Sequence, residues 1–382
     1  MLVAMVTTTG DRCGIAAYTR ALSDALNNLP DVFVEVFPIT EGRQPHSHYE
    51  ALADRLNSSG ADIVHIQHEH SFWGGVMPNA SAFAEFRALI TKPVVLTAHT
   101  TYSLSDLLRV REERRPVKLI AKRLLLLNSR YRRSVDTDPF NGRTIVHTGA
   151  ARDELIARGL TAGKVCVVPT GVPAPVSASA SAERFVRKYG LQGKRLLVIF
   201  GYIAPNKGYE LTLSIINRIP KDVVLVIAGG ARNSDMEPYV ASLSSKIAES
   251  AASDRVLVTG YLSDVEIADV MAAATLVLTP HTQATGSYSV TLPITYGKAI
   301  VASTMDCFVD INRRVNCLEL FISGDVEDYS RKLTALLGDP GRIYEREQQA
   351  LEYARAYSWD AVARITRSVY DAELGGEAAT NR

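Results

Sequence analysis

Two hydrophobic periodicities alternate along the chain. Short apolar runs rich in Val, Ile and Leu have the length and the branched side chains of buried strands. Between these runs, apolar residues recur at helical spacing, as at Ile15, Tyr18, Leu22 and Leu26. Strands that are apolar on both faces and alternate with helices are typical of a parallel sheet that is covered on both sides. The pattern therefore predicts a doubly wound α/β protein.

The alternation occurs twice. In the first half, the pattern predicts strands at 2–7, 32–39, 63–67, 93–97, 144–147 and 164–168. Helices are expected there at 15–29, 49–56, 83–90, through 154–157 and over 107–133. In the second half, strands are expected at 196–201, 223–228, 256–260, 275–279 and 299–302. Helices are expected there at 208–218, 238–250, 263–271, 290–297, 326–337, 344–356 and 358–374. Ser263 and Glu266 have the spacing of a capping box.

A composition break lies between the two halves. Residues 173–182, PAPVSASASA, are rich in Pro, Ser and Ala and lack bulky side chains. Such a stretch is typical of an interdomain linker. We therefore expect two Rossmann-like domains of similar size, 1–173 and 193–357, joined by a linker at 174–192.

Length, charge and composition restrict the classes of protein to which the chain can belong. The length of 382 residues fits two or three domains, and a formal net charge of +1 gives no reason to expect a nucleic-acid partner. No apolar run approaches the roughly 18 residues of a membrane-spanning helix, and the N-terminus, which has no basic leader, is expected to be a strand. The four cysteines are scattered, at Cys13, Cys166, Cys307 and Cys317. Together these features favour a reduced, cytoplasmic enzyme.

The segment 275–303 combines a strand, a polar loop, a helix and a second strand. In a parallel sheet such a loop lies at the carboxyl edge, where ligands bind. Small residues, among them Gly286, Ser287 and Ser289, let backbone N–H groups approach an anion at the start of the helix. We predict a phosphate-binding loop here. An ordinary strand-to-helix turn, with the serines as helix caps, is the alternative.

Six short segments, in order along the chain, carry a resemblance to a known family. They are GIAAYTR at 14–20, LTAH at 96–99, KVCVVPTGV at 164–172, FGYIAPNKG at 200–208, VTGYLS at 258–263 and YSWD at 357–360. Together they resemble the motifs of the GT-B glycosyltransferases, most closely of the retaining class called family 4. The resemblance implies two Rossmann-like domains that face each other across a cleft, with the terminal segment 358–382 crossing back to the N-terminal domain.

The resemblance also implies a site. A nucleotide-diphosphate sugar, the donor, would bind to the C-terminal domain, and the acceptor would bind to the N-terminal domain. The donor-side residues would then be Gly14, Gly201, Tyr202, Lys207, Tyr261, Leu262, Gln283, Thr285, Gly286, Ser287, Tyr288 and Ser289. The acceptor-side residues would be His68, Glu69 and His99, and catalytic roles would fall to His99 and Lys207.

The sequence also departs from the family pattern. Family members carry two glutamates in the donor-binding segment, one for the donor ribose and one near the transferred sugar. The aligned residues in this chain are Ala284 and Leu292, so both glutamates are missing. The arginine of the phosphate loop is replaced by Tyr202, which leaves Lys207 as the cation there. Pro293 is expected to kink the following helix or to delay its start.

Each candidate residue also has an alternative, purely structural explanation. Lys207 would neutralise phosphate charge, or it would be a solvated lysine at a helix start. His99, at the end of a predicted strand, would position a sugar hydroxyl, or it would be a structural histidine. Gly14 would let the first loop approach a ligand, or it would simply begin a helix. His68 and His70, like His46 and His48, form an HxH pair without further ligands in register. The resemblance implies a class that needs no bound metal, so we expect no metal ion and no other cofactor.

These inferences lead to an expected function. A cytoplasmic glycosyltransferase would move a sugar from a nucleotide-diphosphate sugar to a hydroxyl of a carbohydrate, a lipid-linked acceptor or a small molecule, with retention. Because both glutamates are missing, a degenerate chain that binds a nucleotide sugar or a partner transferase without turnover is one alternative. A nucleotide-sugar epimerase is another. The basic region 109–133 would contact the inner face of an anionic membrane, or it would be a solvated helix face.

Overall fold

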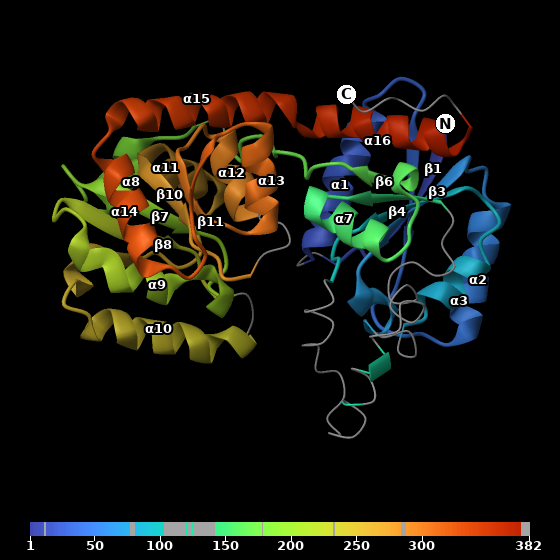
Figure 1. Ribbon diagram of the computed structural model, residues 1–382, viewed down its shortest axis with the longest axis horizontal. Helices are drawn as coiled ribbons and strands as arrows, with labels where there is room; N and C mark the ends of the chain where they lie inside the picture. The colour runs from blue at the N-terminus through green and yellow to red at the C-terminus, as the bar shows by residue number, and fades with distance from the viewer. Residues whose placement is uncertain are drawn as a thin grey trace. The chain divides into compact units, whose positions relative to one another are not determined.

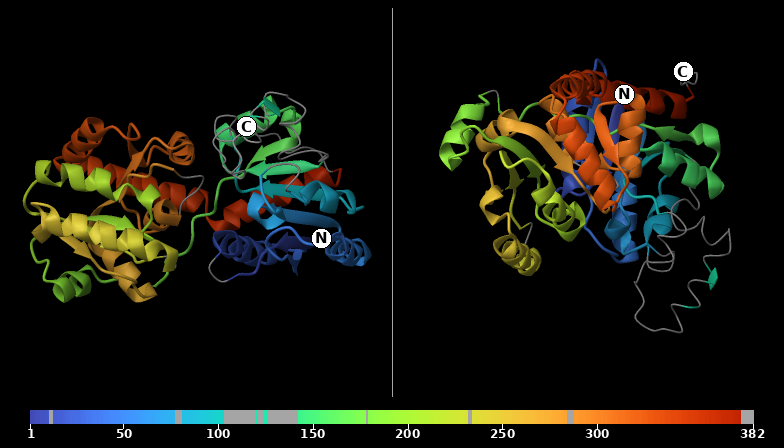
Figure 2. Two further views of the ribbon diagram at one scale, coloured as in Figure 1. Left: turned by 90° about the horizontal axis from the view of Figure 1, so that it is seen from below. Right: turned by 60° about the vertical axis from the view of Figure 1, so that its left-hand side comes forward.

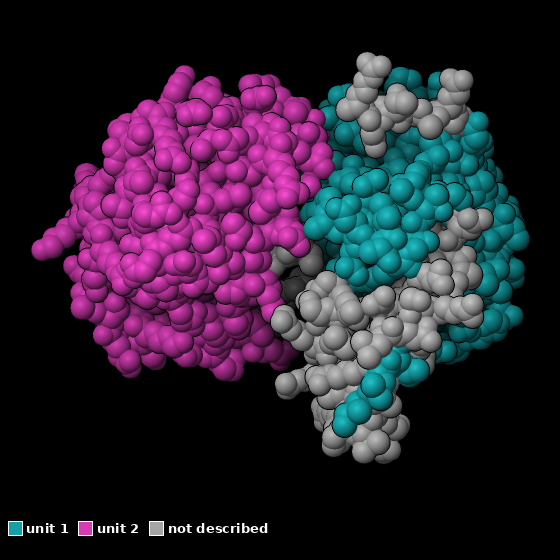
Figure 3. Space-filling view, viewed as in Figure 1, with its two compact units in different colours: residues 1–170, 359–382 teal, residues 171–358 magenta. Residues whose placement is uncertain are grey.

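The computed structural model describes residues 1–10, 13–76, 81–102, 120, 124–125, 142–177, 179–231, 234–283 and 288–375. The chain divides into two compact units, which Figure 3 colours separately. Unit 1 consists of Met1–Thr170 and Trp359–Arg382, and unit 2 consists of Gly171–Ser358. Each unit is a parallel sheet with helices on both faces (Figure 1, Figure 2), which confirms the predicted doubly wound architecture.

Unit 1 is built on six parallel strands in the order β2-β1-β3-β4-β5-β6. The strands are β1 (Leu2–Thr7), β2 (Phe33–Pro38), β3 (Ile63–His68), β4 (Val94–Ala98), β5 (Arg143–Val146) and β6 (Val165–Val167). The helices are α1 (Gly14–Asn27), α2 (His46–Ser58), α3 (Phe83–Ala88), α7 (Gly149–Ala157) and α16 (Trp359–Glu373). Neighbouring residues of β1 enter different cores, since Val6 packs with α2 and α3 whereas Met5 packs with α1 and α16. This division explains why β1 is apolar on both faces.

Unit 2 has six parallel strands in the order β12-β11-β10-β7-β8-β9. The strands are β7 (Arg195–Phe200), β8 (Val223–Ala228), β9 (Val256–Val258), β10 (Ala274–Thr279), β11 (Ile300–Ser303) and β12 (Leu318–Phe321). The helices are α8 (Ala182–Tyr189), α9 (Tyr209–Ile215), α10 (Glu237–Glu249), α11 (Asp264–Ala273), α12 (Tyr288–Thr295), α13 (Asp306–Arg314), α14 (Val326–Leu337) and α15 (Pro340–Ala356). Val198 faces a core shared with α8, α11 and α12, and Ile199 faces one shared with α9, α10 and α14.

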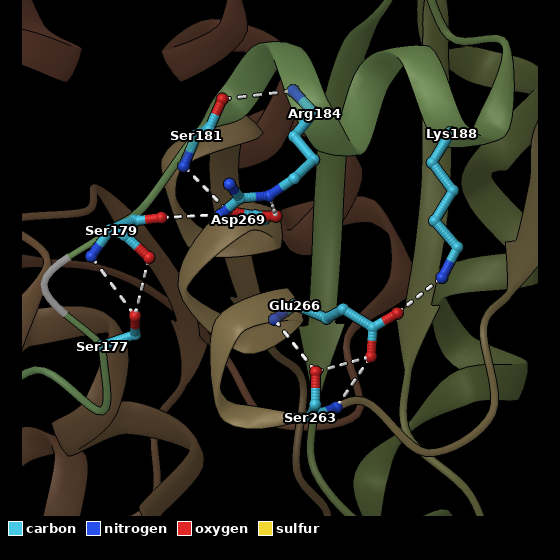
Figure 4. Close-up of polar contacts among 8 residues, drawn as sticks. All are labelled: Ser177, Ser179, Ser181, Arg184, Lys188, Ser263, Glu266 and Asp269. Atoms are coloured by element: carbon cyan, nitrogen blue, oxygen red, sulfur yellow. Dashed lines mark hydrogen bonds and ion pairs between the residues drawn. The ribbon is translucent and has the colours of Figure 1, made fainter.

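The predicted elements are present with small shifts at their ends, apart from the segment 107–133, almost all of which lies outside the described residues. Ser263 and Glu266 form the predicted capping box at the start of α11 (Figure 4). The sequence prediction did not include α13 or β12. Glu319 interrupts the short apolar run of β12, yet its carboxylate is buried and accepts hydrogen bonds from Lys332 and Arg342. Those cations lie on α14 and α15, so the local sequence gives no sign that the glutamate is buried.

The expected linker at 174–192 contains helix α8, which belongs to unit 2. Ser181 caps this helix, because its Oγ accepts from the N–H of Arg184 at 3.2 Å. The Arg184 guanidinium pairs with the buried carboxylate of Asp269 on α11 (Figure 4). Phe185, on the same short helix, packs into the core of the sheet. A cap, an ion pair and one buried ring thus stabilise a helix that the composition of the segment does not predict.

The last helix, α16, packs on α1 within unit 1. Trp359 at its start meets the ring of Tyr18 edge to face, with centroids 5.0 Å apart, and Tyr370 near its end is fully buried. The terminal segment therefore completes the core of the N-terminal unit, as the resemblance implies. None of the helices in the described ranges has the length and apolar character that crossing a bilayer requires.

Candidate active site

The strand order of unit 2 contains a switch point. Strands β7 and β10 are neighbours in the sheet, but the chain continues from β7 to β8 on one side and from β10 to β11 on the other. The loops that follow these two strands therefore diverge at the carboxyl edge, where open α/β sheets bind ligands. The first loop is 201–208 and the second is 280–287, of which 284–287 lie outside the described residues. The predicted phosphate-binding loop is the second of them.

Lys207 lies at this switch point, at the end of the 3-10 helix η3 (Pro205–Lys207). Its Nζ lies 2.9 Å from His281 Nε2 and 3.2 Å from Ser289 Oγ, and those two atoms lie 3.2 Å from each other. A Cβ built on Gly201 would be 3.8 Å from the same Nζ, so the end of β7 runs close to the amine. The cluster thus unites three segments: η3, the loop after β10, and the start of α12.

Burial sets the charges of this cluster. It lowers the pKa of Lys207 to about 8, so the amine still carries its proton at neutral pH. Burial, and after it the positive charge of Lys207, lowers the pKa of His281 to about 3, so the imidazole is neutral. Within the part of the chain that the structure describes, no carboxylate pairs with Lys207. The cluster therefore presents an uncompensated positive charge, which suits an anionic ligand.

Asn206 and Gly208 tie the two loops together. The N–H of Thr282 donates to the Asn206 carbonyl at 2.9 Å, and Asn206 Nδ2 donates to the Gln283 carbonyl at 3.1 Å. Gly208 has a φ of +74°, and a Cβ there would lie 1.9 Å from the carbonyl oxygen of Pro280. Because the second loop passes so close, position 208 requires glycine.

Gly208→Ala is expected to separate the loops and to destabilise unit 2 by about 3 kcal/mol or more, since the methyl group would overlap a backbone oxygen. Gly193→Ala is the matched control. Gly193 also has a positive φ, of +70°, but a Cβ there would meet nothing within 4 Å. Its expected cost is therefore about 1 kcal/mol. Chemical denaturation measures both costs, and equal values would show that the contact with Pro280 does not require glycine.

Three tyrosines at the same edge of the sheet, Tyr202, Tyr261 and Tyr288, have rings that are about half exposed or more. Tyr202 and Tyr261 meet edge to face, with centroids 6.4 Å apart. The ring of Tyr261 also lies against Gly230, where a Cβ would come within 2.8 Å of it. Leu262 instead packs against the core. Exposed aromatic faces of this kind can stack a planar base.

In unit 1, His99 follows β4 and joins a chain of polar groups that are buried or partly buried. Its Nε2 lies 2.8 Å from Gln67 Oε1, and its Nδ1 lies 3.3 Å from His147 Nε2. The Nδ1 of His147 lies 3.0 Å from the carbonyl oxygen of Val168. Tyr18 meets the His99 ring edge to face, with centroids 4.8 Å apart. Burial lowers the pKa of both histidines, so both are neutral at physiological pH.

Both halves of the chain match known families. Residues 181–357 match Glycosyl transferases group 1, and residues 9–174 match Glycosyltransferase Family 4. The chain belongs to the GT-B glycosyltransferases. The fold of this chain is similar to that of Anabaena HepE in complex with UDP, with a TM-score of 0.73 and 14% identity over 97% of this chain and 100% of that one. Sucrose-phosphate synthase from Thermosynechococcus elongatus gives a TM-score of 0.69 and 16% identity over 97% and 98% of the two chains.

The sequence relatives of this chain are distant. It is 24% identical over 208 residues to the 2-deoxystreptamine glucosyltransferase of Streptomyces kanamyceticus, covering 53% of this chain and 52% of the relative. It is 27% identical over 228 residues to the D-inositol 3-phosphate glycosyltransferase of Xylanimonas cellulosilytica, covering 58% and 54%. The chain spans about half the length of these curated relatives. The family resemblance read from the sequence is confirmed.

The structure brings some of the expected donor-side residues together. Gly201, Lys207 and Ser289 form one cluster, and Gln283 is exposed and joins the loops through its carbonyl. Gly14 belongs to unit 1, where it begins α1 with open space around it. Outside the described residues lie Thr285, Gly286, Ser287 and most of the basic region 109–133.

Helix α12 begins before the expected start at Val290. It is already helical at Tyr288, so Pro293 does not delay its start but lies inside it. Leu292, which aligns with the family's ribose-binding glutamate, is fully buried in the core. The structure therefore gives position 292 a packing role.

The expected acceptor contact of His68 needs correction. Its side chain is only 2% exposed and packs edge to face against the rings of His70 and Phe83, so it belongs to the core of unit 1. Burial also lowers its pKa. The carboxylate of Glu69 is engaged by the chain itself: Oε1 accepts from the N–H of His70 at 3.0 Å and Oε2 accepts from Thr100 Oγ1 at 2.6 Å. Glu69 thus fixes the loop and caps the 3-10 helix η1 (His70–Trp73).

Three candidate functional residues were not predicted: His281, Gln67 and His147. Each lies at or just beyond the carboxyl end of a parallel strand, β10, β3 or β5. A polar residue at such an end is the signal that the sequence offers. The signal is too common to select these three, and only their contacts with Lys207 and His99 do so.

Proposed function

We propose that this protein transfers a sugar from a nucleoside diphosphate sugar to an acceptor hydroxyl, with retention at the anomeric carbon. The observation that carries the proposal is the uncompensated ammonium of Lys207 at the switch point of unit 2. Relatives of the same fold support it. Anabaena HepE was solved with UDP, with UDP and glucose, and with UDP-glucose.

In the proposed reaction, the bond from the anomeric carbon to the phosphate oxygen breaks while the acceptor oxygen bonds to the same face of that carbon. Lys207 would stabilise the charge that develops on the departing diphosphate. The acceptor proton would pass to an oxygen of that diphosphate, so the reaction needs no carboxylate nucleophile. The ammonium also supplies positive charge without a metal ion. Tyr202 and Tyr261 would stack the base.

Binding of a nucleotide sugar without turnover is the second candidate function. One observation favours it: position 284 is alanine and position 292 is a buried leucine, so neither carries the family's glutamate. A donor site that lacks both carboxylates would rely on Lys207, on the Ser289 hydroxyl and on backbone N–H groups. Such a site could hold the diphosphate and still fail to orient the sugar.

A panel of UDP-, GDP- and ADP-sugars tests both candidates. A transferase is expected to bind one nucleoside diphosphate in calorimetric titrations. It should also release that nucleotide from its sugar faster when an acceptor extract is added. Binding without release, for every acceptor extract, would support the second candidate. If none of the three nucleoside diphosphates binds, the proposal is wrong.

A further inference from the structure

His281 is a buried imidazole whose orientation is fixed by its neighbours. It is 2% exposed, and its ring meets Phe308 of α13 edge to face, with centroids 5.5 Å apart. Its backbone carbonyl accepts from Ser303 Oγ at 2.7 Å, at the end of β11. The first contact packs the ring against α13, and the second holds the backbone of His281 against the neighbouring strand. Its Nε2 points to the amine of Lys207, 2.9 Å away.

We infer that His281 is the positioning residue of Lys207: its neutral Nε2 accepts one N–H of the ammonium and directs the others toward a bound anion. The imidazole carries its own proton on Nδ1, because an Nε2 that accepts from Lys207 has none. The inference rests on the proposed function only in naming the anion, the diphosphate of a nucleotide sugar.

Ser289 completes the arrangement. Its Oγ accepts a second N–H of Lys207 at 3.2 Å, so two of the three ammonium hydrogens are directed by the chain. Neither acceptor carries a charge at neutral pH, since burial keeps the pKa of His281 low. Lys207 is therefore held in position with its full positive charge.

A carboxylate in place of His281 would hold the amine at least as firmly, but it would change the site. It would neutralise the ammonium, raise its pKa and compete with a phosphate for its hydrogen bonds. An aliphatic side chain would leave Ser289 Oγ alone to direct the amine. The neutral imidazole of His281 orients the N–H groups of Lys207 and leaves the positive charge of the ammonium intact.

Three variants test the inference. His281→Gln offers an amide oxygen that can accept the same N–H, His281→Leu offers no acceptor, and His281→Glu adds a carboxylate. The ligand is UDP, GDP or ADP, whichever the parent protein binds most tightly. Its dissociation constant is measured calorimetrically from about pH 6.5 to 9.5, a range that brackets the Lys207 titration.

We expect His281→Leu to weaken binding about tenfold or more, and His281→Gln to stay within about threefold of the parent. His281→Glu should weaken binding at pH 7 and shift the pH at which affinity is lost upward by about one unit or more, because the carboxylate raises the pKa of Lys207. Equal dissociation constants and equal pH profiles for His281→Leu and the parent would overturn the inference.

A measurement without ligand separates this inference from the proposed function. NMR of lysine-labelled protein reports the pKa of Lys207 directly, and that pKa should rise in His281→Glu. If it is unchanged in every variant, the inference is wrong even though the parent binds a nucleotide. If the parent binds none, the proposed function fails while the Lys207 pKa still decides the inference. Thermal unfolding checks that each variant folds, and the Gln and Glu variants keep the test decisive if the Leu variant does not.

Discussion

Replacing Lys207 with methionine is expected to weaken the binding of nucleoside diphosphates by about 100-fold or more. Lys207 supplies the positive charge at the switch point, and its neighbours His281 and Ser289 are neutral. Methionine keeps the length of the side chain but offers neither charge nor N–H. The loss should appear in calorimetric titrations with UDP, GDP and ADP, and as an equal or larger loss of sugar transfer.

The same substitution is expected to stabilise unit 2. The Lys207 ammonium has a pKa of about 8 instead of 10.5, and this shift corresponds to a cost to the folded state of up to about 3 kcal/mol at pH 7. In the variant, Ser289 Oγ can donate to His281 Nε2, 3.2 Å away, so both groups keep a partner. We expect a net gain of about 1–3 kcal/mol, which would raise the melting temperature by about 3 °C or more.

The pH dependence distinguishes this explanation from improved packing. Below pH 8 the folded and unfolded chains both hold the Lys207 proton, and the cost of burying the charge is greatest. Between about pH 8 and 10.5 the folded chain loses that proton while the unfolded chain keeps it, so the parent gains stability as the pH rises. The stability advantage of the methionine variant should therefore shrink between about pH 8 and 10.5.

The affinity of the parent for nucleotide should fall over the same pH range by up to about tenfold per pH unit, because a bound anion keeps the proton on Lys207.

Lys298→Met is the matched control. Lys298 is a second partly buried lysine whose pKa is lowered by burial, but it lies at the amino edge of the sheet, where its Nζ donates to the Ala274 carbonyl at 3.2 Å. Nucleotide binding by this variant should equal that of the parent. If Lys207→Met binds nucleotide as tightly as the parent, or if Lys298→Met loses binding to the same degree, Lys207 is not the anion-binding group.

Strand β10 and its loop show how much of this site the sequence predicts. The apolar run and the Gly/Ser loop are enough to predict a strand, its carboxyl edge and a phosphate site there, and a family motif adds Lys207. Neither predicts His281, which lies 74 positions from Lys207 along the chain. Their contact exists because β7 and β10 are neighbours in the sheet, and this order is a property of the whole fold.

Residues that the sequence misplaces share one physical cause. Prediction from local sequence assumes that polar residues are exposed, but a polar group can be buried when a distant element supplies its partners. Rings of η1 and α3 cover His68, and cations on α14 and α15 compensate Glu319 inside β12. Helix α8 is the converse case. Its segment has the composition of a linker, and Phe185 with the Arg184–Asp269 pair holds it on the core.

The second large effect is expected at His99 in unit 1, where donors and acceptors fix the positions of the protons. The Val168 carbonyl can only accept, so His147 carries its proton on Nδ1 and accepts at Nε2 from His99 Nδ1–H. The Nε2 of His99 is then an acceptor. The Gln67 amide, whose Oε1 is placed 2.8 Å from it, must therefore take the reversed orientation, with its N–H group toward His99. This arrangement leaves both histidines neutral, as their burial requires.

His99→Ala is expected to lower the rate of sugar transfer by about 100-fold, the effect of misplacing reacting groups by about 1 Å. Removing the ring leaves Gln67 and His147 without their partner and releases the loop that follows β4. The dissociation constant of the nucleoside diphosphate should stay within about twofold, because Lys207 belongs to unit 2. Steady-state kinetics and calorimetry measure the two quantities separately.

His46→Ala is the control, since it makes the same change at an exposed histidine of unit 1 that pairs with Glu85. It should alter neither transfer nor binding.

Gln67→Glu distinguishes positioning from packing. A carboxylate can only accept a hydrogen bond, so it favours a proton on His99 Nε2. The pKa of the histidine pair should therefore rise, and nitrogen NMR would report this change. Loss of transfer in His99→Ala but not in Gln67→Glu would reduce His99 to a packing role. Loss of transfer in both His99→Ala and Gln67→Glu, with nucleotide binding intact, is the expected result. Both variants disturb the same arrangement of protons in the hydrogen-bond chain, so this result would support a positioning role for His99.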